Sequence, residues 1–247
     1  LGHALYMKAI SADKIKTDAL NAKTIADLMR SNFLPEAYPY PSKMRATRDL
    51  LRRRHRLVHL RAEANTHIQL MSHQYAIEGI DASVIKKEDQ WDTIESAFKE
   101  HNLVPSIQTD LDVIRSLSPV IKAVEKEIQD NAIFHNPRDF LLLKSVPGIG
   151  EILGLVILYE THDIRRFKRH QNYASYSRVV RCEQISNGKV VGRKNQKIGY
   201  PYLKWAFNPI IIPARKTSEP IAKHYQRLES KFGKPRAKAR LAHKFCK

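Results

Sequence analysis

The chain has 247 residues, of which 43% are hydrophobic and 28% charged, a balance that indicates a folded protein and excludes a disordered one. Lysine and arginine number 43 against 25 acidic residues, and this net charge of +18 favours a polyphosphate partner over a merely soluble basic protein. No apolar run approaches the roughly 20 residues of a membrane span, and the start shows no secretory pattern. The two cysteines are too few for a disulfide scaffold or a zinc site, so we expect a cytoplasmic protein that does not contact a membrane.

Residues 1–12 predict the end of a strand and a loop, and a helix begins after Thr17, a plausible N-cap. Asp18 and Asn21 are three residues apart on one face of this helix. Two carboxylates so placed could hold Mg²⁺ for phosphoryl transfer. The second position is a neutral amide, however, so the local pattern favours helix capping and a polar surface.

Prolines at positions 35, 39 and 41 mark a linker, after which residues 42–75 predict one long helix. Its apolar residues recur every seven positions, which is typical of a coiled coil or an antiparallel hairpin. The other faces are rich in arginine, including Arg52, Arg53 and Arg54. A solvated basic face and a contact with nucleic-acid backbone explain this run equally well.

A polar excursion over residues 76–105 separates this helix from a second one, over residues 107–131, whose isoleucines and leucines line one side. Two long helices joined in this way predict a hairpin or a dimerisation arm. The sequence from His135 onward then opens a compact unit.

Apolar helical patterns flank a short turn of Pro147, Gly148, Ile149 and Gly150. The glycines can adopt positive φ and let another backbone approach closely. The free N–H groups at the start of the following helix form a ready anion site, and a helix-hairpin-helix holds a DNA phosphate in this way without reading bases. We favour such a DNA contact over a plain tight turn between two core helices.

Asn187-Gly188 predicts a type I′ β-hairpin turn with Ser186 beside it. A serine hydroxyl among cations could attack a DNA phosphodiester while the cations hold the phosphate. Serine is also a common turn residue, and no His or Asp lies close by in sequence to act as a base, so spacing alone favours the turn role. The surrounding cations are Arg178, Arg181, Lys189, Arg193, Lys194 and Lys197.

Taken together and in order, six stretches make the chain resemble the insertion-sequence one-hundred-and-ten family of transposases, the RNA-guided bridge recombinases. The resemblance covers nearly the whole chain. The stretches are "LGHALYMKAI", "KTDALNAKTIADLMR", "MRATRDLLRRRHRLVHLRAE", "LLLKSVPGIGEILGLVILYETHDIRRF", "SRVVRCEQISNGK" and "KIGYPYLKWAF".

The resemblance implies a mainly α fold: the end of an α/β RNase-H-like domain, long coiled-coil helices, and a mostly helical transposase domain with a helix-hairpin-helix and a short β-hairpin. It divides the chain into residues 1–35 as the remnant of a RuvC-like domain, residues 36–136 as a helical coiled-coil region, and residues 137–247 as the C-terminal transposase domain. The implied partners are DNA, a guide RNA and further copies of the chain, which would assemble through the coiled coil.

The resemblance also assigns roles to residues. Ser186 matches the catalytic serine, and Asp18 and Asn21 match the last two of four acidic residues that bind Mg²⁺. The family has Asp where this chain has Asn21, which removes a negative charge and should weaken Mg²⁺ binding. The first two acidic residues would lie upstream of Leu1, so we expect a chain truncated at both ends and inactive by itself.

Two other departures from the family concern the C-terminal domain. Tyr200 replaces the usual Asn, and Asn208-Pro209 interrupts a helix that normally continues. We expect a DNA transposase fragment. The alternatives are a non-catalytic nucleic-acid-binding remnant that uses the helix-hairpin-helix and the basic helix, and a pseudogene product that does not fold stably.

Overall fold

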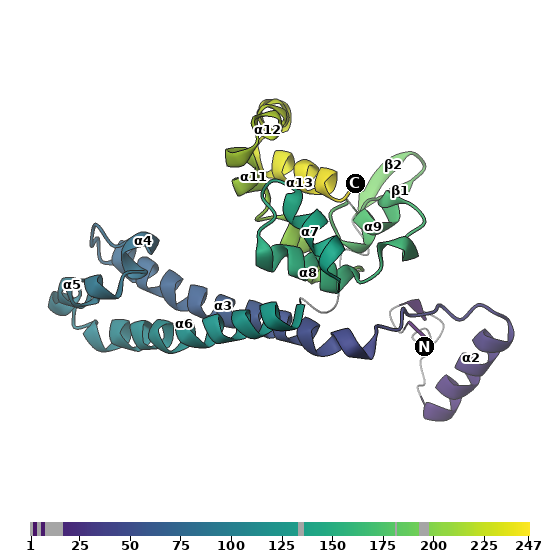
Figure 1. Ribbon diagram of the computed structural model, residues 1–247, viewed down its shortest axis with the longest axis horizontal. Helices are drawn as coiled ribbons and strands as arrows, with labels where there is room; N and C mark the ends of the chain where they lie inside the picture. Colours follow the sequence, from purple (N-terminus) through teal and green to yellow (C-terminus); the bar gives the residue numbers. More distant parts are fainter. Residues whose placement is uncertain (1, 4–5, 8–16, 133–135, 181, 193–197) are drawn as a thin grey trace.

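The computed structural model describes residues 2–3, 6–7, 17–132, 136–180, 182–192 and 198–247 (Figure 1). These ranges are mostly helical and contain one two-stranded antiparallel hairpin, which confirms the prediction of a mainly α fold. No helix within them is long and apolar enough to cross a bilayer.

The first helix, α2 (Asp18–Arg30), begins where the sequence predicts. The hydroxyl of Thr17 accepts a hydrogen bond of 3.3 Å from the N–H of Leu20, as an N-cap does. None of the residues of α2 is buried. Gly2, which precedes this helix, and Glu36, which follows it, form an isolated antiparallel bridge. Because residues 1, 4–5 and 8–16 lie outside the described ranges, the predicted strand end and the RuvC-like assignment of residues 1–35 stay predictions.

A helical arm follows, formed by α3 (Ser42–Gln74), α6 (Val104–Ala132) and the short helices between them (Figure 1). The two predicted long helices are thus confirmed, and they pair antiparallel as a hairpin. The short elements are α4 (Ala82–Ile85), η2 (Glu88–Gln90), α5 (Trp91–Ala97) and η3 (Lys99–His101).

The tip of the helical arm has its own apolar core. Ile85, Trp91, Ile94 and Phe98 are buried against the ends of α3 and α6. The excursion between the long helices is therefore a packed cap, although its sequence is polar overall. Burial of each large apolar side chain contributes about 1.5–3 kcal/mol, which holds the two helix ends together.

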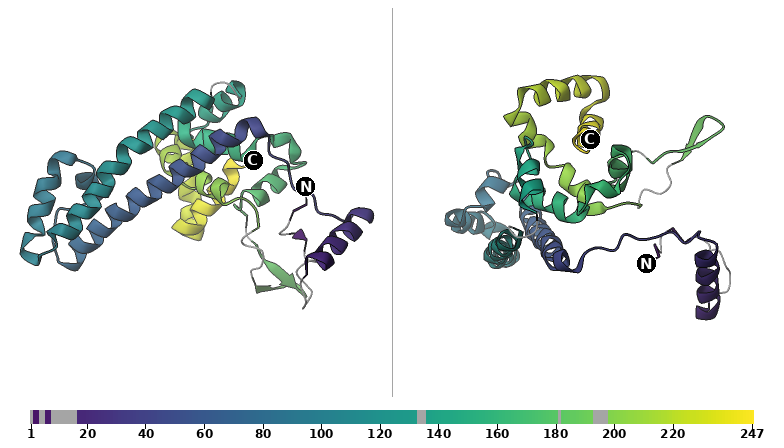
Figure 2. Two further views of the ribbon diagram at one scale, coloured as in Figure 1. Left: turned by 90° about the horizontal axis from the view of Figure 1, so that it is seen from below. Right: turned by 45° about the vertical axis from the view of Figure 1, so that its right-hand side comes forward.

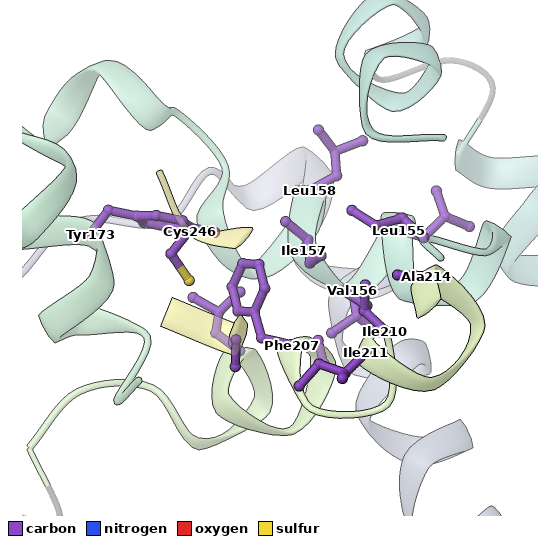
Figure 3. Close-up of a cluster of buried hydrophobic side chains, with 14 of the residues drawn as sticks. Leu155, Val156, Ile157, Leu158, Tyr173, Phe207, Ile210, Ile211, Ala214 and Cys246 are labelled. Carbon is purple, nitrogen blue, oxygen red and sulfur yellow. The ribbon is translucent and has the colours of Figure 1, made fainter. Parts of the chain in front are cut away.

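The C-terminal unit, residues 137–247, is built around α8, whose last eight residues are all buried. Figure 3 shows apolar side chains of this helix packed against those of α10 and α11. Leu203, Ala206 and Phe207 of α10 are buried in this core, and Asn208-Pro209 separates α10 from α11. The helices are α7 (Pro137–Ser145), α8 (Glu151–Thr161), η4 (Ile164–Arg166), α9 (His170–Tyr176), α10 (Pro201–Phe207), α11 (Ile211–Thr217), α12 (Glu219–Phe232) and α13 (Lys234–Phe245).

The core of the C-terminal unit extends into the helical arm. Leu51 of α3 and Ile128 and Ala132 of α6 belong to the same buried cluster as the α8 side chains. The linker before α3 is also attached, because the hydroxyl of Tyr40 donates a 2.8 Å hydrogen bond to the carbonyl of Tyr159. The arm is therefore fixed to the C-terminal unit at its base, while its tip extends away (Figure 1).

Candidate nucleic-acid interface and serine turn

The predicted β-hairpin is present as β1 (Gln184–Ser186) and β2 (Lys189–Gly192), paired antiparallel. Asn187 has φ 48° and Gly188 has φ 72°. Positive φ at both central residues is the signature of a type I′ turn, so this prediction is confirmed. Figure 2 shows the hairpin projecting from the helices of the C-terminal unit.

Ser186 is exposed at the end of β1, and its partner across the hairpin is Lys189. Directly opposed residues of an antiparallel pair share one face of the sheet, with Cβ atoms about 4.5–5.5 Å apart. The ammonium group of Lys189 is therefore within reach of any group that the Ser186 hydroxyl touches. We call residues 186–189 the serine turn.

Arg178 fixes the base of this hairpin to α9. It adopts φ 55°, and its Nε donates hydrogen bonds of 3.1 and 2.9 Å to the carbonyls of Ile198 and Gly199. These contacts give Arg178 a structural role, and its predicted contact with nucleic acid stays a prediction. Arg181, Arg193, Lys194 and Lys197 lie outside the described residues.

The turn between α7 and α8 uses its two glycines differently. Gly148 has φ 90°, and a Cβ there would lie 2.5 Å from the carbonyl oxygen of Ile210 and 2.7 Å from the backbone nitrogen of Ala214. Figure 3 shows Ile210 and Ala214 in the buried cluster. The close backbone approach predicted for this turn is therefore made with α11, and Ile149 is buried as well.

Gly150 is the residue of this turn that stays open to a ligand. It is exposed, precedes α8 as its N-cap, and has no other part of the protein within 4 Å of an added Cβ. Glu151, in the first turn of α8, places a negative charge beside the same N–H groups. That carboxylate interacts favourably with the helix dipole, and its negative charge would repel a phosphate at the same position. The predicted DNA contact of residues 147–150 thus rests on exposed Pro147 and Gly150.

Arg52 of α3, which is half-buried, forms an ion pair with the buried Glu160 of α8. Its Nε and Nη2 donate hydrogen bonds of 2.8 and 3.0 Å to the two carboxylate oxygens, and Nη2 also reaches the hydroxyl of Tyr200. The side chain of Glu160 is only 1% exposed. Hydrogen bonding to Glu160 raises the pKa of Arg52 still further above its usual value. Tyr200 thus completes this internal network.

Replacing the buried carboxylate should reveal the network in a stability measurement. We expect Glu160→Gln to lower the free energy of unfolding by about 2 kcal/mol, because the half-buried Arg52 would lose its buried counter-charge and keep only the exposed carboxylate of Asp49 at 3.8 Å. Urea denaturation of the variant and of the wild-type chain measures the difference. Arg30→Gln, which breaks a solvent-exposed pair with Asp27, is the control and should change stability by less than about 1 kcal/mol.

Arg54 is also paired within the protein, because its guanidinium contacts the carboxylate of Glu125 on α6 at 2.6 Å. Arg53 is exposed between these two paired residues. For Arg52 and Arg54 the structure therefore supplies an internal role that the sequence pattern did not indicate. Their predicted contact with nucleic acid stays a prediction, carried best by Arg53.

Asp18 and Asn21 lie in the first turn of α2, where Asp18 is exposed and Asn21 half-buried. Figure 1 shows α2 and the β-hairpin at separate places in the molecule. Within the described ranges no three His, Cys, Asp or Glu side chains are grouped to hold a metal ion. The structure thus does not bring the predicted metal ligands and the predicted nucleophile into one site.

Sequence reasoning overlooked a basic surface on α12 and α13. Residues 219–247 contain nine lysines and arginines against two glutamates, and most of these cations are exposed. The excess of lysine and arginine over glutamate in this segment is the sequence signal that would have predicted this surface.

Residues 141–226 match the model of the Transposase IS116/IS110/IS902 family. The match runs from α7 to α12 and includes the turn before α8 and the serine turn. No curated protein matches the chain. The segment of residues 141–226 is therefore similar to the transposases of the IS116/IS110/IS902 family.

Proposed function

We propose that the chain is part of a transposase that, as an intact protein, cleaves and exchanges DNA strands in transposition, with Ser186 as the nucleophile. The observation that carries this proposal is the position of Ser186. It is an exposed hydroxyl on a projecting type I′ hairpin, opposite Lys189, within the segment that matches the transposase family. An exposed hairpin tip can enter a groove of DNA, which a buried serine cannot do.

The chemistry is a transesterification. The Oγ of Ser186 attacks phosphorus and forms a P–O bond, the bond from phosphorus to one deoxyribose oxygen breaks, and that oxygen leaves with a proton. The hydroxyl proton of Ser186 is lost in the same step. Lys189 would hold a non-bridging phosphate oxygen and stabilise the charge that develops there. Attack by a hydroxyl of another strand on the phosphoserine then releases Ser186 and completes the exchange.

We propose Mg²⁺ as a cofactor only together with further acidic ligands. Asp18 and Asn21 supply one charged and one neutral oxygen, and Mg²⁺ usually combines one or two carboxylates with water and phosphate oxygens. When bound, the ion would neutralise phosphate charge. Since α2 and the serine turn are separate in this structure, we derive no step through the ion.

We further propose that the helical arm mediates homo-oligomer formation and that a guide RNA is a second nucleic-acid partner. The arm extends beyond the C-terminal unit and exposes apolar side chains, among them Leu70, Val113 and Val120. Replacing these three residues with serine should shift the chain to a smaller species in sedimentation experiments. The guide RNA rests on the resemblance alone.

The test of the catalytic proposal is a covalent adduct. An intact transposase that contains this chain together with the further acidic ligands is incubated with duplex DNA that spans the ends of its element, with Mg²⁺, and then denatured. We expect a protein–DNA species that survives denaturation and disappears after protease treatment. Salt-sensitive binding without any adduct would contradict catalysis and leave the chain as a non-catalytic nucleic-acid-binding protein.

A further inference from the structure

The last two helices carry a local excess of positive charge, nine lysines and arginines against two glutamates in residues 219–247, that the predicted interface does not include. On α13, the buried residues Ala237, Leu241 and Ala242 occupy one side of the helix. Arg236, Arg240 and Lys244 are exposed and follow one another at i, i+4 and i+8. These three positions fall within one narrow stripe of an α-helix, because residues three and four apart are neighbours.

Among the described residues, these cations have no acidic partners like those that neutralise Arg52 and Arg54 of α3. Among the ion pairs of the described residues, the one within α12 and α13 joins Lys223 to Glu219, at the start of α12. The guanidinium of Arg240 lies 3.8 Å from the ring centroid of Phe232. A cation–π contact orients the guanidinium but removes none of its charge. The side chain is thus held in place and remains available to an anion.

Two histidines on α12 and α13, His224 and His243, lie near these cations. Burial lowers the pKa of His224, and the charges of Lys244 and Arg227 lower it further. The pKa of His243 is also lowered, first by burial and then by Lys247 and His170. Lys244 of α13 and Arg227 of α12 thus both lie near His224, and α12 packs against α13. We call Arg227, Arg236, Arg240 and Lys244 the C-terminal basic face.

We propose that the C-terminal basic face is a binding site for the phosphate backbone of double-stranded DNA, distinct from the serine turn. The proposal rests on the proposed action on DNA and adds the surface that holds the duplex. Unpaired cations on a rigid helix bind most favourably to a dense, regular polyanion such as duplex DNA, because binding releases the counterions of the phosphates. Such contacts position a duplex without reading its sequence.

A membrane surface is a poorer fit to the same cations. Helices that bind a bilayer combine a basic face with an exposed apolar face. The apolar face of α13 is already occupied, because Ala237, Leu241 and Ala242 belong to the buried cluster of the C-terminal unit. Only the charged side of α13 is open to a partner. The helix can therefore make an electrostatic contact, but it has no free apolar face to insert into a bilayer.

The test is the salt dependence of binding to duplex DNA of arbitrary sequence. In the triple variant Arg236→Gln, Arg240→Gln and Lys244→Gln, the slope of log K against log salt should become less steep by about 0.9 for each phosphate that is no longer neutralised, or about 2–3 in all. The weakening should be similar for unrelated DNA sequences. The control replaces Lys86, Lys87 and Lys99, which are exposed near the arm tip, with glutamine and so removes the same charge.

The outcomes separate this proposal from the catalytic one. A variant that binds with the wild-type slope, or a control that weakens as much as the triple variant, would overturn the C-terminal basic face as a site. A triple variant that loses affinity for an RNA hairpin but keeps it for duplex DNA would also overturn it. If the wild-type chain binds no duplex DNA, both proposals fail, whereas DNA binding by this face without a covalent adduct contradicts the catalytic proposal alone.

Discussion

Gly148→Ala is expected to destabilise the C-terminal unit by about 3–4 kcal/mol, because two penalties add at this position. An L-residue at φ 90° costs about 1–2 kcal/mol. The new methyl group would also lie 2.5 Å from the carbonyl oxygen of Ile210, and overpacking of this kind costs about 1–3 kcal/mol. Since the clashing atoms are backbone, a change of side-chain rotamer cannot relieve the clash. Chemical denaturation measures the destabilisation directly.

Gly150→Ala is the matched control within the same turn. Gly150 has φ −79°, and an added Cβ meets nothing within 4 Å, so the change should cost no more than about 1 kcal/mol. If the backbone at Gly150 approaches a DNA phosphate, the bulkier Gly150→Val should weaken DNA binding while the chain remains folded. Equal stability of Gly148→Ala and the wild-type chain would contradict the packing role of Gly148.

Local signals in the sequence predict a large part of this fold. Thr17 caps α2, the two long helices appear at nearly their predicted limits, and Asn187-Gly188 forms the expected turn. Each of these features depends on residues within a few positions of one another. Capping, helical periodicity and turn chemistry are physical preferences of such short segments, so one sequence suffices to read them.

Contacts between distant segments are what the sequence could not supply. Arg52 and Glu160 are separated by 108 residues, and nothing in either neighbourhood shows that they pair. The same holds for Gly148, whose neighbour is α11, and for the apolar residues of the arm tip, which are divided among short helices. An arginine-rich run therefore indicated a binding face where the structure shows, for two of its arginines, internal ion pairs.

The internal ion pairs of Arg52 and Arg54 affect which surface of the protein can bind nucleic acid. A cation already paired with a buried carboxylate offers little net charge to a phosphate, and separating the pair would leave Glu160 unpaired inside the protein. When the cations of α13 bind a phosphate, no ion pair with a buried carboxylate has to be separated. Among the described residues, the C-terminal basic face and Lys189 of the serine turn thus offer positive charge to DNA without breaking a buried ion pair, and both belong to the C-terminal unit.

Ser186→Ala is expected to abolish the covalent protein–DNA adduct and strand exchange completely, while leaving stability and DNA affinity unchanged. The hydroxyl is exposed, so its removal opens no cavity and leaves no buried polar group unpaired. It is also uncharged, so the electrostatic part of DNA binding should not change. Only the chemical step requires this oxygen, because without it no phosphoserine can form.

The measurement compares adduct formation, thermal unfolding and DNA affinity in the wild-type protein and the variant. Ser230→Ala is the control, because Ser230 is an exposed serine on α12, outside the hairpin, and its replacement should leave all three quantities unchanged. An adduct formed by Ser186→Ala at the wild-type level would show that another residue is the nucleophile. Loss of the adduct together with loss of DNA affinity would instead identify Ser186 as a binding residue of the turn.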